Sequence, residues 1–122
     1  MWQPRGAFGE PSLTCRVIGE GSADVVLSLG GTLSGDAASR RLERSVEEQS
    51  GEPDVRRIHL DLRGLRSIDL EGIAVLVHAY RQSQGCGKSL TVEGAGGPVR
   101  RRLQTTGILR IMSPPGPAAS AS

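Results

Sequence analysis

The sequence predicts an α/β domain built around a mixed, mostly parallel sheet. Stretches with apolar residues at every second position, typical of strands, alternate with stretches whose apolar residues recur at helical spacing. Their order is β-β-α-β-α-β-α-β, and the three strand–helix–strand crossovers in series favour parallel pairing, with one antiparallel strand at the edge. A chain of 122 residues has the length of one domain.

The first half of the chain predicts a hairpin followed by a helix. Leu13–Ile18 and Ala23–Leu29 alternate in hydrophobicity on either side of a short turn that contains glycine. Asp36 can cap a helix by accepting hydrogen bonds from the free amides of its first turn, and Gly51 ends that helix. The segment between the hairpin and this helix is expected to be a loop.

The middle of the chain predicts a strand, a loop and a second helix. Val55–Leu62 places alternate apolar residues on one face, and Arg63–Ile68 is expected to be a loop. The helix that follows has an apolar stripe, with Asp69 as its natural N-cap and Gly85 near its end.

The last part of the chain predicts strand, helix and strand. Ser89–Glu93 is expected to be the fourth strand. Pro98 suits the first turn of a third helix, since its missing amide hydrogen costs nothing there, and Gly107 suits the end of that helix. Ile108–Met112 is expected to be the last strand.

The ends of the chain differ in composition from its body. Residues 1–12 contain several Gly and Pro breakers, and residues 113–122 contain no residue that would fill a core. We therefore expect a flexible head, a domain over residues 13–112, and a disordered tail.

Composition argues against several classes of function. The net charge of +2 and only three aromatic residues give no basis for direct nucleic-acid binding. The longest apolar run, residues 73–77, is far too short for membrane insertion, and the first residues lack a signal-peptide pattern, so a cytoplasmic location is expected.

The reactive residue types are few and scattered. Cys15 and Cys86 form no disulfide framework and are expected to be reduced thiols, and their spacing to the two histidines suits no metal site. His59 and Asp61 lie two apart on one strand face, but no nucleophile accompanies them. We expect a protein that is not an enzyme and that holds neither metal nor cofactor.

Three separated pieces of the sequence carry a family resemblance. They are Leu29-Gly30-Gly31-Thr32-Leu33 after the second strand, Asp69-Leu70-Glu71-Gly72 before an apolar helix, and Val99-Arg100-Arg101-Arg102-Leu103 near the last helix. In this order they resemble the STAS domain, the fold shared by bacterial anti-sigma factor antagonists and the tails of sulfate transporters. The resemblance extends over most of the chain.

One position departs from the pattern of the antagonists. There the residue after the aspartate is a serine, which is phosphorylated by a kinase that is also the anti-sigma factor. Here that position is Leu70, which has no hydroxyl, and Glu71 follows where the family often has serine or a small residue. A second family acid, after the second strand, is replaced by Ser34. We therefore expect no phosphorylation switch at Leu70. The acid at Glu71 is compatible with a protein that is always competent to bind its partner and with one that is always blocked.

The resemblance implies a protein that acts by binding a partner. The partner would be an anti-sigma factor with a histidine-kinase-like ATPase fold, and binding would free a sigma factor; the protein itself would be a monomer or weak dimer. The docking residues would come from two neighbouring turns: Ser34, Asp36, Asp69, Leu70, Glu71, Gly72 and Ile73.

Other interpretations of the same residues stay open. Asp69 and Glu71 suit a helix start on purely structural grounds, and Leu70 suits either a buried plug or an exposed anchor. The run Arg100–Arg102 is typical of a solvated helix face, or else of a surface for an anionic partner or lipid headgroup. A second hypothesis for the whole protein is a STAS adaptor subunit of a membrane-associated, lipid-transport-like complex, and a third is a sensor of a small ligand.

Overall fold

The computed structural model describes residues 13–112, so the predicted head and tail lie outside the described residues. After an initial strand pair, helices and strands alternate until two successive helices end the described part of the chain. The elements are β1 (Leu13–Ile18), β2 (Asp24–Leu33), α2 (Gly35–Ser50), β3 (Arg57–Ile68), α3 (Leu70–Gly85), β4 (Ser89–Glu93), α4 (Gly97–Thr106) and α5 (Ile108–Met112).

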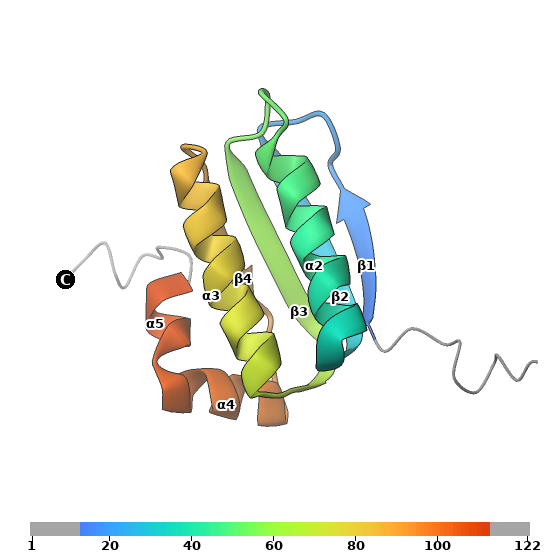
Figure 1. Cartoon of the computed structure of the whole chain (residues 1–122), viewed down its shortest axis with the longest axis vertical. Helices are drawn as coiled ribbons and strands as arrows, with labels where there is room; N and C mark the ends of the chain where they lie inside the picture. The colour runs from blue at the N-terminus through green and yellow to red at the C-terminus, as the bar shows by residue number, and fades with distance from the viewer. Residues whose placement is uncertain (1–12, 113–122) are drawn as a thin grey trace, which may run out of the picture.

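The four strands form one mixed sheet in the order β1-β2-β3-β4. β1 runs antiparallel to β2, whereas β2, β3 and β4 are parallel to one another. The predicted architecture is thereby confirmed: the hairpin supplies the antiparallel edge strand, and the crossover helices keep the other strands parallel. Figure 1 shows α2 and α3 side by side across one face of the sheet.

The core lies between the sheet and these helices. Alternate residues of the three parallel strands, such as Leu27, Leu60 and Leu90, are fully or almost fully buried on the helical side. They meet the apolar faces of α2 and α3, represented by Leu42 and Leu76, which are fully buried as well. The apolar residues at every second position of the strands and at helical spacing in the helices therefore face one common core, as the sequence indicated.

The central strands extend further than predicted. The expected loop over residues 63–68 belongs to β3, and β2 continues to Leu33. In this extension Gly31 pairs with Leu65 after one register shift, and Leu33 pairs with Ile68 after a second. These irregularities break the two-residue alternation of buried side chains, and for that reason the pattern indicated a loop.

The predicted last strand is wrong, because Ile108–Met112 forms the short helix α5. Gly107, at the C-cap of α4, adopts a left-handed φ of 80°, which turns the chain out of one helix and into the next. α5 packs on α4 and β4 through the buried Ile108, while Ile111 stays exposed. A short apolar run does not distinguish a strand from a helix, and here tertiary packing decides.

Candidate docking site

The predicted docking residues follow β2 and β3, at the carboxyl ends of two neighbouring parallel strands. Ser34 follows β2 in an extended conformation, and Gly35 then opens α2 with a φ of +83°. Ser34 occupies the N-cap position of α2 without a side-chain capping bond, and Asp36 lies in the first turn. Asp36 is therefore not the cap that the sequence predicted; the helix begins one residue before it.

The start of α3 follows the prediction closely. Asp69 is the N-cap, and its Oδ1 accepts a hydrogen bond of 2.8 Å from the amide of Gly72. Leu70 is the first helical residue and is 70% exposed, whereas Ile73, one turn later, is buried in the core. Of the two interpretations of Leu70, the buried plug is therefore wrong: its side chain lies at the surface.

Backbone contacts hold the two turns together. The amide of Asp69 donates a hydrogen bond of 3.3 Å to the carbonyl oxygen of Leu33, the last residue of β2. Gly72 lies so close to this strand end that an added Cβ would collide with the Leu33 carbonyl oxygen and would come within 2.8 Å of Ile68 Cγ1. Gly72 is thus required by close packing, and it brings the first turn of α3 against the junction of β2 and α2.

Two acidic side chains meet across this junction. The pKa of the Glu71 carboxyl is raised, first because the neighbouring Asp36 carboxyl shares a hydrogen bond with its protonated form, and then because Asp36 is negatively charged. Burial and the charge of Asp69 add smaller effects in the same direction. Glu71 therefore lies in an acidic pair contributed by both helices, and it gives up its proton less readily than an isolated glutamate.

Leu70 also borders a groove that leads away from these acids. A hollow of about 420 Å³ separates the start of α3 from α4, and Leu70, Arg101 and Arg102 all line it. From the sequence, the run Arg100–Arg102 was expected to be a surface separate from the motif at Asp69 and Leu70. The fold places Arg101 and Arg102 beside that motif. No spacing rule links positions thirty residues apart, so only the packing of α4 could have revealed this proximity.

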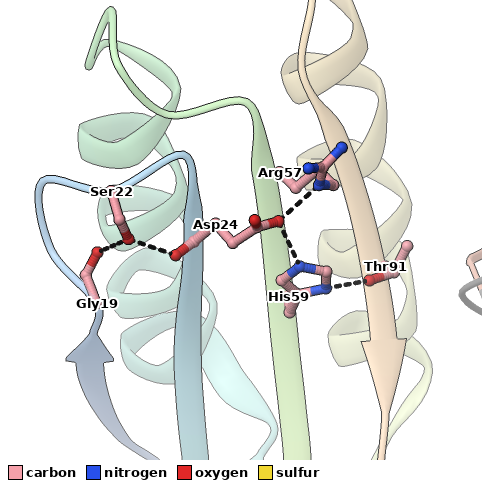
Figure 2. A network of polar contacts seen from close by, with 6 residues as sticks. All are labelled: Gly19, Ser22, Asp24, Arg57, His59 and Thr91. Atoms are coloured by element: carbon pink, nitrogen blue, oxygen red, sulfur yellow. Dashed lines mark hydrogen bonds and ion pairs between the residues drawn. The ribbon is translucent and has the colours of Figure 1, made fainter.

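The predicted pair of His59 and Asp61 has a structural explanation. Figure 2 shows His59 between Asp24 and Thr91, with nitrogen–oxygen distances of 3.3 and 3.0 Å, while Arg57 donates a 2.6 Å hydrogen bond to Asp24. The hydrogen bond from Arg57, followed by that from His59, lowers the pKa of the Asp24 carboxyl. The network ties β2, β3 and β4 together on the sheet face opposite the buried core residues.

Asp61 takes no part in that network. It pairs instead with Arg63, whose Nη2 lies 2.9 Å from Oδ2, and this hydrogen bonding lowers the pKa of the Asp61 carboxyl. His59 and Asp61 therefore have different partners and do not form a dyad with each other.

Two further findings concern metal ligands and membrane spans among the described residues. Across residues 13–112, no group of three or more His, Cys, Asp or Glu side chains is arranged to hold a metal ion. Within the same range, none of the helices combines the length and the apolar character needed to cross a membrane.

Comparison with known proteins decides the family. The family model described as "Mlab, STAS domain" matches residues 18–113, most of the chain. The chain belongs to the STAS family. No curated protein sequence matches it.

Several solved structures share the fold at low sequence identity. An anti-sigma factor antagonist from Mycobacterium paratuberculosis is 19% identical with a TM-score of 0.71, and the match covers 91% of this chain and 93% of that one. The unphosphorylated anti-sigma factor antagonist SpoIIAA is 16% identical with a TM-score of 0.68, over 80% of this chain and 84% of that one. The murine anion transporter Slc26a9 is 16% identical with a TM-score of 0.60, over 73% of this chain but only 14% of the transporter.

Proposed function

We propose that this STAS protein acts as an anti-sigma factor antagonist: it binds an anti-sigma factor with a histidine-kinase-like ATPase fold and thereby frees a sigma factor. The observation that carries the proposal is the exposure of Leu70 at the joined turns of β2–α2 and β3–α3. A large apolar side chain left 70% exposed gains free energy when a partner covers it. Nothing in this action requires a chemical step by the protein.

The proposed docking surface comprises the turn residues of both helices. Ser34 and Asp36 lie at the start of α2, and Asp69, Leu70 and Glu71 lie at the start of α3. Gly72 and Ile73 complete the set by supporting this surface. Gly72 packs closely against the end of β2, and Ile73 is buried in the core. A central apolar residue with a polar rim is the usual composition of a protein interface.

The proposal includes the loss of phosphorylation control at this site. A phosphoryl group needs a hydroxyl, and the exposed side chain at the first position of α3 is that of a leucine. The acidic pair of Glu71 and Asp36 would be a permanent feature of the surface, in contrast to a phosphate that is added and removed.

Cross-linking from the proposed contact residue tests the docking function. A photoreactive amino acid at position 70 should form a covalent link in cells to an ATPase-type anti-sigma factor, which mass spectrometry would identify. The matched control is the same amino acid at position 18, because Ile18 is 48% exposed and lies on β1 next to the start of β2, at the opposite end of that strand from Ser34. Equal linking at both positions, or no link at position 70, would contradict the proposal.

Intact-mass measurement tests the missing switch. After incubation with the identified partner and ATP, the wild type should gain no phosphate, whereas Leu70→Ser should gain one. Phosphate on the wild type at any serine would show that the protein retains a phosphorylation switch.

A second candidate is an adaptor subunit in a membrane-associated assembly. The family description that names Mlab and the occurrence of this fold within the transporter Slc26a9 favour it. The cross-linking experiment separates the candidates, because an adaptor would be linked through position 70 to a subunit of a transport complex.

A further inference from the structure

Apolar and basic side chains together line the groove beside Leu70. Ile68, Leu70 and Pro98 are its apolar residues. Arg101 and Arg102, on successive positions of α4, are its basic residues. Its volume of about 420 Å³ falls within the range of small-molecule pockets.

Within the described part of the chain, the arginines of this groove have no acidic partner. Every residue that lines the groove is neutral or basic. Among residues 13–112, the ion pairs involve other cations, and neither Arg101 nor Arg102 takes part in one. Their guanidinium groups are therefore available to an external anion, with which they form charge-assisted hydrogen bonds.

The hydroxyl groups of the groove already donate their hydrogen bonds within the protein and do not compete with the arginines for an anion. Thr105 and Thr106 donate their hydroxyl protons to backbone carbonyl oxygens one turn earlier in α4, at 2.9 and 3.1 Å. Ser67 donates to the hydroxyl of Thr32 at 3.3 Å. The side-chain donors left free are the guanidinium groups, so the groove selects for negative charge over neutral polarity.

The other grooves near the helix starts lack this combination. The hollow between α2 and α3 contains Glu43 and Glu71 as well as Asp36, which oppose an anion. The hollow on α2 is lined by Arg40, Arg44 and a further arginine, with an alanine as its single apolar residue. Only the groove beside Leu70, among these hollows, offers cationic donors next to large apolar side chains.

We propose that the groove between α4 and the start of α3 binds a small amphiphilic anion, in which a carboxylate or phosphate group meets Arg101 and Arg102 and an aliphatic body covers Leu70. This inference does not depend on the proposed partner. It adds a ligand that would share Leu70 with the docking surface.

Titration with a matched series of soluble probes tests the inference. We expect octanoate to shift the backbone amide NMR signals of Leu70 and Arg101 in a saturable way. Octan-1-ol has the same chain without the charge and should bind about tenfold more weakly, which is the effect of losing a charge-assisted hydrogen bond. Octylammonium, which carries the opposite charge, should give no saturable shift at these residues.

Paired double variants assign the anion to its arginines. Arg101→Gln with Arg102→Gln should weaken octanoate binding about tenfold or more. Arg40→Gln with Arg44→Gln removes the same charge from a groove without large apolar side chains, and should leave octanoate binding unchanged. Unfolding midpoints equal to that of the wild type establish that both double variants are folded.

Each other result overturns the inference. Absence of saturable octanoate shifts, equal binding of octylammonium, or equal effects of the two double variants would refute a specific anion site. Sedimentation with vesicles of phosphatidylcholine, with and without phosphatidylglycerol, distinguishes the source of the anion. Binding to the anionic vesicles without binding to free octanoate would show that the arginines contact a bilayer surface, and would refute the small-ligand site.

Discussion

Replacing Gly72 by alanine gives a direct test of how the docking surface is built. The new methyl group would overlap with the carbonyl oxygen of Leu33 and approach Ile68 Cγ1 to 2.8 Å and Leu33 Cγ to 2.9 Å. Leu33 is fully buried and its carbonyl belongs to β2, so neither of its atoms can move freely. Relief of the overlap therefore requires α3 to move away from the strand end.

Two opposing effects set the change in the free energy of unfolding caused by Gly72→Ala. Overpacking of a close-packed site costs about 1–3 kcal/mol. Alanine is more favourable than glycine inside a helix by about 1 kcal/mol, but the first turn gains only part of this. The movement would also strain the 3.3 Å hydrogen bond from the Asp69 amide to Leu33. We expect Gly72→Ala to lower the free energy of unfolding by about 2 kcal/mol.

Urea unfolding followed by far-UV circular dichroism measures this change. The matched control is Gly85→Ala at the other end of α3, where an added Cβ meets nothing within 4 Å. That variant should be as stable as the wild type, or more stable by up to about 1 kcal/mol. Equal stability of Gly72→Ala and Gly85→Ala would refute the reasoning that close packing joins the two turns.

Three further predictions concern the same surface. Asp69→Ala removes the capping bond and should cost about 1 kcal/mol in urea unfolding, with Asp69→Asn much less affected. The carboxyl-carbon NMR titration of Glu71 should occur above its usual pKa range and should shift back toward that range in Asp36→Asn, where only burial and Asp69 still raise the pKa. Because the folded form holds this proton more tightly than the unfolded chain, Glu71 should contribute stability as pH falls from neutral through its raised pKa. A lowered pKa of Glu71 would contradict the account. Leu70→Ala should change stability by no more than about 0.5 kcal/mol, whereas Leu76→Ala, at a fully buried position of the same helix, should cost about 2–5 kcal/mol.

The sequence predicted the fold because its strands and helices carry strong local signals. The helix of α3 follows from an apolar stripe preceded by a capping aspartate, and the structure confirms both. The predictions failed where the pattern was irregular: β3 continues through register shifts that break the alternation, and Ile108–Met112 is too short for its apolar run to distinguish a helix from a strand.

The candidate site was predictable in its members but not in its surroundings. A motif at the start of a helix located Asp69 and Leu70, since capping and helix position are local properties. The exposure of Leu70, the meeting of Glu71 with Asp36, and the groove shared with α4 depend on packing between distant segments. No local pattern carries that information.

Binding of the cross-linked partner by purified variants tests the central claim most directly. Isothermal titration calorimetry would compare the wild type with Leu70→Asp and with Ile18→Asp, which places the same charge at an exposed position at the other end of the sheet. The account predicts that Leu70→Asp weakens binding at least about tenfold while Ile18→Asp binds like the wild type, because a charge would be buried at the centre of the interface only in the first variant. Unchanged binding by Leu70→Asp would contradict the account.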